Sequence, residues 1–330
     1  MGSVVCGTGK ALPQLEVSND DLSAIVDTSD EWITKRTGIH NRRIAVQETA
    51  TSLAVDAGLQ ALDAAGFSAE SLDLVICATS TPDSIMPSQA ALVRRAIGAR
   101  NAAAFDVNSA CTGCVVALTL ADSLLKTLAG AKRALVVGAE CMSRIVDWTD
   151  RGTCVLFGDG AGAVALESQA ERRGIFAARL KGEDDADNVL TCPATYPAPV
   201  PFRSEAPDGG SLENSQVISM KGREVFKFAT RVIPEMLTQV AADAGMPLED
   251  VRLIVPHQAN LRIIAYAAKK LGLPLERFQV SIAETGNTSA ASALMALCDA
   301  YREGKLQQGD VVAMAGFGAG LSAGALLLEV

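Results

Sequence analysis

The two halves of this chain repeat each other, and the repeat constrains its fold more than any other feature. Three apolar segments of the first half have counterparts in the second: Leu74 with Leu253, Ala134 with Val311, and Ala161 with Ala323. The first two pairs are offset by about 178 residues and the third by about 162, which predicts an insert near residues 144–158. Such self-similarity indicates an internally duplicated unit.

The repeated unit mixes strands and helices. Apolar strands alternate with amphipathic helices such as Thr51–Ala65 and Leu261–Leu271, a pattern that predicts an α/β fold with sheets covered by helices. The length of 330 residues suits two sizeable lobes, and we place the halves at 1–170 and 171–330. The proline-rich stretch Pro193–Gln216 between them is expected to be a long loop.

Cys111 lies where a reactive thiol would be placed. A short strand ends near Val107, the capping residues Asn108 and Ser109 follow, and an apolar helix is expected to run from the first turn around Cys111 to about Ala129. Free N–H groups at a helix start stabilise a thiolate. The sequence therefore suggests a covalent nucleophile, while the alternative is a small buried cysteine.

The cysteines and the lack of long apolar runs indicate the cellular compartment and limit the possible metal and redox chemistry. The eight cysteines have no paired spacing, which favours reduced thiols in the cytoplasm. Cys111 and Cys114 form a single Cys-x-x-Cys pair that allows a redox role, but a zinc site needs a second pair. No secretory signal or apolar run of roughly 18 residues is evident, so no membrane is expected.

The charge is acidic overall but locally basic. A net charge of −9 argues against nucleic acid as a partner. The stretch from Lys221 to Arg277 contains nine Lys and Arg residues but only six Asp and Glu residues, which gives a local net charge of +3. This excess is either an ordinary solvated surface or a docking patch for an anionic partner.

Two further motifs are candidates for chemistry. The chain has only two histidines: His40 lies in a polar turn, whereas His257 follows the apolar strand 252–256, where α/β folds place sites. Asn287 precedes a helix that begins near Ser289, and it either caps that helix or donates into a pocket. The stretch Gly316-Phe-Gly-Ala-Gly reads as a turn whose amides could bind an oxyanion.

Together these motifs resemble a known family. Ala110-Cys-Thr-Gly, Pro256-His-Gln-Ala-Asn and Gly286-Asn-Thr-Ser are similar to the three catalytic motifs of β-ketoacyl-acyl carrier protein (ACP) synthase III. Thr28-Ser-Asp-Glu-Trp-Ile and Phe157-Gly-Asp-Gly-Ala-Gly extend the resemblance over essentially the whole chain. It implies a thiolase-like fold, with two duplicated halves in five α-β-α-β-α layers, and a homodimer.

The resemblance implies a decarboxylative Claisen condensation. Cys111 would be acylated by acyl-CoA, a substrate rather than a cofactor, and malonyl-ACP would then lose carbon dioxide and attack the acyl group. His257 and Asn287 would stabilise the malonyl enolate. The backbone N–H groups of Cys111 and Ala319 would bind the acyl oxyanion. No metal or redox cofactor is implied.

By the same matching, further residues acquire expected roles. The contacts to CoA are expected from Thr28, Trp32, Arg36, Arg151 and Gly222. The basic patch that docks ACP is expected from Lys227, Arg262, Lys269 and Lys270. Met86 would close the acyl pocket of the dimer partner.

Three departures bear on acyl specificity, and several readings compete. Thr112, Ser322-Ala323 and the long 193–216 loop differ from the family pattern.

A second reactive cysteine near the glycine turn, as a thiolase needs, is missing, and Asn287 argues against the chain-elongating synthases. Chalcone-synthase-like enzymes carry a different glycine motif. An acyltransferase of the same family, a starter-unit condensing enzyme of secondary metabolism and a non-catalytic subunit remain as alternatives.

Overall fold

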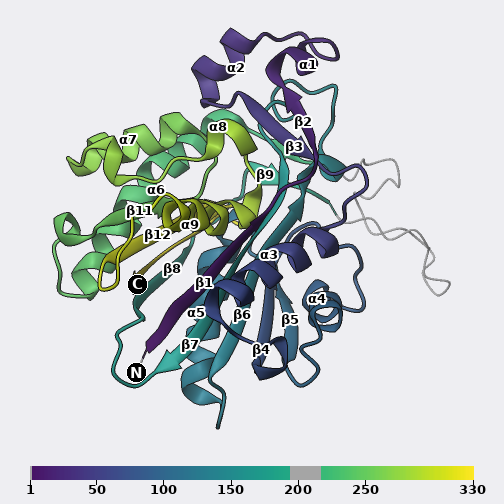
Figure 1. Cartoon of the computed structure of the whole chain (residues 1–330). Coiled ribbons are helices and arrows are strands. Elements are labelled where there is room, and N and C mark those ends of the chain that lie inside the picture. Colours follow the sequence, from purple (N-terminus) through teal and green to yellow (C-terminus); the bar gives the residue numbers. More distant parts are fainter. Residues whose placement is uncertain (1, 194–216) are drawn as a thin grey trace, which may run out of the picture.

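Two mixed β-sheets form the body of the protein in a computed structural model, which describes residues 2–193 and 217–330 (Figure 1). The first sheet has the order β1-β7-β6-β4-β5 and the second β11-β12-β13-β8. The strands of the first are β1 (Gly2–Ala11), β4 (Leu74–Ala78), β5 (Ala103–Val107), β6 (Arg133–Cys141) and β7 (Asp159–Gln169). Those of the second are β8 (Ile175–Gly182), β11 (Leu253–Pro256), β12 (Val311–Gly318) and β13 (Ser322–Glu329).

The sheets are built the same way, which confirms the duplication. In the first, β4 and β6 are parallel and β6 and β7 antiparallel; in the second, β11 and β12 are parallel and β12 and β13 antiparallel. The register agrees as well, because Gly138 pairs with Gly162 as Gly316 pairs with Gly324. Residues 142–158 join β6 to β7, whereas only 319–321 join β12 to β13. The expected insert is therefore present; the division at residue 170 stays a prediction.

Helices complete five layers. The main helices are α3 (Ala50–Ala65), α4 (Gln89–Ile97), α5 (Gly113–Thr127), α6 (Gly222–Asp243), α7 (Leu261–Leu271) and α9 (Ser292–Arg302). Strand residues alternate between two cores, since Leu135 packs with α3 and α4 while Val136 packs with α5 and α9. Helices α6 and α7 cover the outer face of the second sheet. The α-β-α-β-α arrangement of a thiolase-like fold is confirmed.

Smaller elements form a cap over one end of the layers (Figure 1, top). They are β2 (Leu15–Ser18), α1 (Asn19–Ser23), α2 (Asp30–Thr37), β3 (Asn41–Ile44), β9 (Leu190–Thr191), β10 (Ser219–Met220) and α8 (Ile282–Thr285). Their apolar side chains share one core with the 142–158 insert, for example Leu22 and Ile33 against Met142 and Val155. The insert thus packs against the cap, and the second half has no equivalent segment between β12 and β13.

Helix α5 lies between the sheets but differs in detail from the sequence prediction. It ends at Thr127 rather than near Ala129, and the apolar side chains of Leu120 and Leu128 are exposed. Within the described chain, only Ala110–Thr127 has the length and composition to cross a membrane. Because 56% of that window is buried inside the protein, it is best explained as a core helix.

Candidate active site

Cys111 sits in a short 3₁₀ turn, Ala110–Thr112, that leads into α5. The helix proper begins at Gly113, and the expected cap from Ser109 is absent, because its side chain accepts no N–H there. Asn108 partly takes this role, since its Oδ1 accepts the N–H of Ala110 at 3.4 Å. Ala110 itself has a φ of +45°, a left-handed backbone that costs a non-glycine residue energy.

The Cys111 thiol is buried, with 8% exposure, and its resting form is protonated. Burial raises the pKa of Cys111 to about 12, and the nearby Glu140 adds to the rise. The sequence-based expectation of a thiolate stabilised by the helix start is therefore wrong for the resting protein, because desolvation outweighs it. The thiol donates to Ser289 Oγ at 3.5 Å.

His257 follows β11, as the sequence predicts, and is almost fully buried. Its Nδ1 lies 2.6 Å from Ser292 Oγ, which also accepts the N–H of Gln258 at 3.2 Å. Its ring packs edge-on against Phe317, with centroids 5.3 Å apart. Burial lowers the pKa of His257 to about 3, so the imidazole is neutral at physiological pH. By contrast, His40 is exposed, as expected.

Asn287 is held by its own backbone and side chain. Its N–H donates to Leu156 O at 2.8 Å, and its carbonyl accepts from Gly158 N at 3.1 Å, so the insert fixes its position. Its side-chain Oδ1 accepts the N–H of Ser289 at 2.8 Å. The capping role and the pocket role are therefore compatible, because the bound oxygen leaves the NH₂ group to donate into the cavity.

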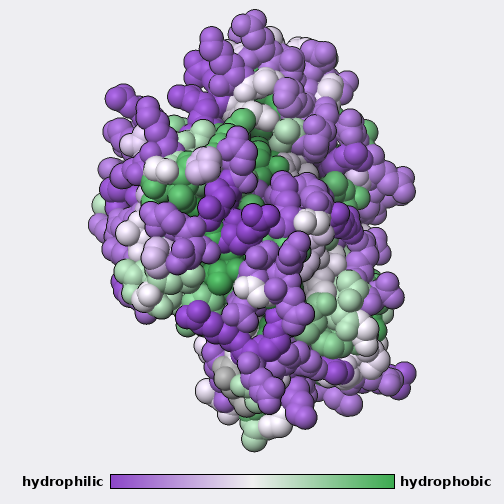
Figure 2. Space-filling model, turned by 60° about the vertical axis from the view of Figure 1, so that its left-hand side comes forward, coloured by the Kyte–Doolittle hydropathy of each residue, from purple (hydrophilic) through white to green (hydrophobic). Residues whose placement is uncertain are grey.

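One cavity of about 490 Å³ brings Cys111, His257 and Asn287 together. Its wall is largely apolar, with Leu156 and Phe317 among its lining residues. Arg262 of α7 and Gly222 at the start of α6 also line it. On the face turned forward in Figure 2, apolar side chains are visible between hydrophilic ones near the centre. Such a cavity suits a chain that is mostly apolar and carries a few polar groups.

A second cavity of about 460 Å³ is also lined by Cys111, together with Ile85, Met142 and Ile145. Ala319 lines it too and belongs to the turn 319–321, because β12 extends through Gly318. The expected glycine turn thus begins later than predicted. Met86 lines neither of these two cavities, and its side chain is 85% exposed.

The residues expected to hold CoA lie mostly at the mouth of the first cavity. Trp32, Arg36 and Arg151 all line it, and the two guanidinium groups stack on the indole at 4.6 and 4.8 Å from the ring centroid. Such contacts are typical cation–π pairs. Thr28 does not line the cavity, and its hydroxyl is buried without a hydrogen-bond partner.

The expected basic patch divides between α6 and α7. Lys227 pairs with Glu224 at 3.0 Å, which partly neutralises it. Arg262 stacks over Phe226 beside the cavity, and Lys269 and Lys270 are exposed in the last turn of α7. Among the ion pairs of the described residues, none includes these last three cations.

Two of the departures from the family pattern touch each other. Thr112 Oγ1 lies 2.9 Å from Ser322 Oγ, which donates to Ala319 O at 3.0 Å. The turn that carries Cys111 is thus linked by hydroxyl groups to the turn that carries Ala319. The third departure, the 193–216 loop, lies outside the described residues from position 194 onward.

Sequence reasoning missed Ser289, Ser292 and Glu140, which surround the motif residues. Glu140 is fully buried, with 0% exposure, at the end of strand β6. A charged residue within the apolar run Ala134–Cys141 was the available signal. The two serines lie within the Asn287 motif, but nothing in the sequence says which hydroxyl faces the thiol and which the imidazole.

Several cysteines carry free thiols, namely Cys6, Cys77, Cys111, Cys114, Cys141, Cys154 and Cys298. In the part of the chain that the structure describes, no group of three or more His, Cys, Asp and Glu residues could hold a metal ion.

Comparisons with known proteins show the family and the fold of this chain. Residues 105–183 and 241–330 match the family models of 3-oxoacyl-[acyl-carrier-protein (ACP)] synthase III and its C-terminal part. The chain is 47% identical to the β-ketoacyl-[acyl-carrier-protein] synthase III of Clostridium acetobutylicum, covering 100% of this chain and 99% of that one. The crystal structure of 3-oxoacyl-[acyl-carrier-protein] synthase III from Aquifex aeolicus is similar, with a TM-score of 0.91 and 45% identity over 100% of both chains. The priming β-ketosynthase of the R1128 polyketide pathway has a TM-score of 0.88 and 34% identity, covering 99% of this chain and 96% of that one.

Proposed function

Since this chain belongs to the 3-oxoacyl-[acyl-carrier-protein] synthase III family, we propose that its acyltransferase chemistry is performed by Cys111, His257 and Asn287. The enzyme condenses an acyl primer from acyl-CoA with malonyl-ACP to give β-ketoacyl-ACP, the step that starts fatty acid synthesis. One observation carries the residue assignment: all three side chains line the same cavity, although they are far apart in sequence.

In the first step, Cys111 Sγ attacks the thioester carbon of acyl-CoA and the CoA sulfur leaves as a thiol. Negative charge develops on the acyl oxygen. The N–H of Cys111 can donate to this oxygen, because the neighbouring Gly318 has no Cβ. A Cβ there would lie only 2.8 Å from that nitrogen. The N–H of Ala319 is the second proposed donor.

In the second step, malonyl-ACP loses carbon dioxide and its enolate attacks the acyl-Cys111 carbon. Donation of the Ser292 hydroxyl proton to His257 Nδ1 leaves the imidazole proton on Nε2. A neutral Nε2–H group and the NH₂ group of Asn287 then donate to the enolate oxygen. These steps use no metal or redox group. Acyl-CoA is a substrate and not a cofactor, because it is consumed when its acyl group moves to Cys111.

The cavity mouth is proposed to bind CoA. Trp32 offers a ring face, and Arg36 and Arg151 offer guanidinium groups for phosphate. Gly222 leaves room for the pantetheine arm, because the nearest atom to a Cβ there is a methionine methyl group at 3.6 Å. Thr28 is a weaker candidate, because it lies outside the cavity lining.

The ACP partner is proposed to dock on α6 and α7. ACP is acidic, and Arg262, Lys269 and Lys270 supply exposed positive charge on α7, the helix whose Arg262 lines the cavity. Lys227 is placed at the edge of this patch, with its charge shared with Glu224.

The remaining proposals concern assembly and compartment. We propose a homodimer in which Met86 closes the partner's acyl pocket, since its side chain is 85% exposed and apolar. The free buried thiols support a reducing compartment, the cytoplasm.

A second candidate is a starter-unit condensing enzyme of secondary metabolism. The structural likeness to the R1128 priming β-ketosynthase favours it, although at lower identity than the relative from Aquifex aeolicus. The two candidates differ in primer and in pathway. A family member that only transfers acyl groups is the third, and it would release no carbon dioxide.

Intact mass measurement tests the proposal. The protein is incubated with a panel of acyl-CoAs, beside Cys111→Ser, and malonyl-ACP is then added. We expect one acyl adduct on the native protein, none on the variant, and loss of the adduct with release of carbon dioxide. No adduct from any acyl-CoA would overturn the assignment of Cys111. Transfer to an alcohol or amine without carbon dioxide would overturn the condensation.

A further inference from the structure

The Cys111 thiol has to lose its proton, and the three motif residues do not explain how. Burial raises the pKa of the thiol to about 12. His257 is a poor base, because burial lowers its pKa to about 3, and its Nδ1 already faces Ser292. Asn287 has no basic atom. The group that receives the thiol proton is therefore neither His257 nor Asn287.

The structure shows where the thiol proton points. Cys111 Sγ donates to Ser289 Oγ at 3.5 Å. The Ser289 hydroxyl also lies close enough to Glu140 to lower the pKa of that carboxyl group. Thiol, hydroxyl and carboxylate thus follow one another in space, and the thiol proton already points to the hydroxyl oxygen. Ser289 has a φ of +45°, an unfavourable backbone for a non-glycine residue, and such strain gathers at functional sites.

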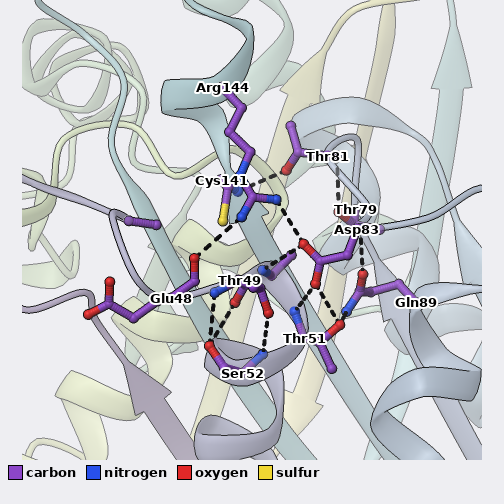
Figure 3. A network of polar contacts seen from close by, with 12 residues as sticks. Glu48, Thr49, Thr51, Ser52, Thr79, Thr81, Asp83, Gln89, Cys141 and Arg144 are labelled. Atoms are coloured by element: carbon purple, nitrogen blue, oxygen red, sulfur yellow. Dashed lines mark hydrogen bonds and ion pairs between the residues drawn. The ribbon is translucent and has the colours of Figure 1, made fainter.

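Glu140 is held in place by many donors. Its carboxylate accepts from Thr81 Oγ1 at 2.5 Å, from Ser80 N at 3.1 and 3.2 Å, and from Ala290 N at 3.4 Å. Thr81 also accepts the N–H of Cys141 at 2.8 Å, in the polar network around Asp83 and Arg144 shown in Figure 3. The carboxylate is therefore fixed in position and ionisable, yet sealed from solvent.

We propose that Ser289 is a catalytic residue that relays the Cys111 proton to Glu140 as Sγ attacks acyl-CoA. Ser289 Oγ takes the proton from Sγ while its own proton passes to a Glu140 oxygen. Sγ forms a bond to the acyl carbon, and the bond from that carbon to the CoA sulfur breaks. The proton then returns through Ser289 to the departing sulfur, so that free CoA leaves as a thiol. Glu140 acts through Ser289 and is a positioning residue.

Charge explains why a relay is favoured. Ionising the thiol alone would place two negative charges in one buried site, and Glu140 already opposes this. In the relay the site holds a single negative charge throughout, which moves from Glu140 to sulfur. Burial raises the pKa of Glu140 above its usual value and makes it a better base than an exposed carboxylate. The titratable groups that face Glu140 are the thiols of Cys77, Cys111 and Cys141, whose pKa values burial also raises.

This inference rests on the proposed acylation of Cys111, and one experiment separates the two. The rate of Cys111 acylation is measured by mass spectrometry between pH 5 and 9 for the native protein, Glu140→Gln and Ser289→Ala. In the native protein we expect a rate that rises with pH through the pKa of Glu140 and then levels off. Each variant should lose about 100-fold at pH 7, the contribution of a general base. Its rate should then rise tenfold per pH unit, because only hydroxide remains as base.

The double variant sharpens the test, because members of one relay are not additive. Ser289→Ala with Glu140→Gln should be no slower than either single variant. Ser289→Gly removes the same hydroxyl and relieves the left-handed backbone, so it shows whether lost rate reflects misfolding. Ser109→Ala, a hydroxyl loss on the other side of Cys111, is the matched control and should keep the native pH profile.

The outcomes are distinct. Native acylation with an unchanged pH profile in Glu140→Gln would overturn the relay and leave the nucleophile intact; Glu140 would then be a clamp between two turns. Failure of the native protein itself to acylate would overturn the proposed function. Additive losses in the double variant would also overturn the relay.

Discussion

Two equivalent turns, one from each half, differ in chemistry but share a backbone. The first turn is Asn108–Gly113 and the second is Asn287–Ser292, with each position 179 residues from its counterpart. In both, the asparagine oxygen accepts the N–H two residues on, and that residue has a φ of +45°. Both then pass through a 3₁₀ turn into a central helix.

The side chains have diverged within this common frame. The first turn carries Cys111 where the second carries Ala290, and the second carries Ser289 and Ser292 where the first has Ala110 and Gly113. One turn thus supplies the nucleophile. The other supplies hydroxyl groups that contact the thiol and the imidazole. In the proposed mechanism, the first turn carries the covalent centre and the second carries hydroxyl groups that contact the thiol and the imidazole.

The strands behind the turns differ in a matching way. Glu140 of β6 and Gly318 of β12 are 178 residues apart and occupy equivalent places. Glu140 accepts the N–H of Ala290, whereas the glycine leaves the N–H of Cys111 uncovered. The backbone N–H of Ala290 in the second turn therefore has a carboxylate partner, whereas that of Cys111 in the first turn stays uncovered.

The largest expected effect is loss of the nucleophile. Cys111→Ala should reduce turnover by about 10⁴-fold or more, because no other group forms the covalent intermediate. Cys114→Ala is the matched control, since this thiol is also buried with its pKa raised to about 12 and lies one turn further along. Steady-state turnover measures both, and equal losses would contradict a unique role for the first turn.

The glycine pair gives the next largest effect and separates chemistry from stability. A Cβ at Gly318 would lie 2.8 Å from Cys111 N, so Gly318→Ala should slow acylation by about 100-fold. A Cβ at Gly138 would lie 2.6 Å from Ala290 O, so Gly138→Ala should instead lower stability by about 1–3 kcal/mol.

Acylation kinetics and urea unfolding of both glycine variants make this comparison. Far-UV circular dichroism shows whether each variant is folded. Native acylation by a folded Gly318→Ala protein would mean that the N–H of Cys111 is not an oxyanion donor.

Much of this architecture is readable from sequence, and the limits are physical. Apolar strands repeat visibly because each half buries them in an equivalent sheet, so the duplication could be predicted, whereas the five layers were implied by the family resemblance. The equivalence of Asn108 and Asn287 escaped notice because a hydrophobic comparison does not align polar turns. Helix polarity suggested an ionised Cys111, but burial, which depends on the tertiary structure, raises its pKa to about 12.

A smaller effect is expected from Ser292, whose counterpart is Gly113. Ser292→Ala removes the hydroxyl that lies 2.6 Å from His257 Nδ1, so the imidazole should lose its fixed tautomer. The rate of condensation should then fall by about tenfold, which is at the low end of general acid–base effects. Acylation should be unchanged. Nitrogen NMR of the ring is the readout, and in the native protein it should not change between pH 5 and 9, because the pKa is about 3. A native ring that titrates in that range would contradict the account.

The smallest effect is expected from the first turn's asparagine. Asn108→Ala removes one cap and should lower stability by about 0.5–2 kcal/mol while condensation stays within a few-fold of native. Thermal unfolding beside an activity assay makes the measurement. A collapse of condensation would show that the two asparagines are functionally alike, against the division of labour described above.

The division of labour between the turns is tested most directly by separating the two half-reactions in Asn287→Ala. The variant is loaded with acyl-CoA, and the acyl group on Cys111 is followed by intact mass before and after malonyl-ACP is added. The account predicts that the acyl-enzyme forms but persists, because the enolate has lost a donor. Discharge of the acyl group at the native rate, or failure to load it in a folded variant, would contradict the account.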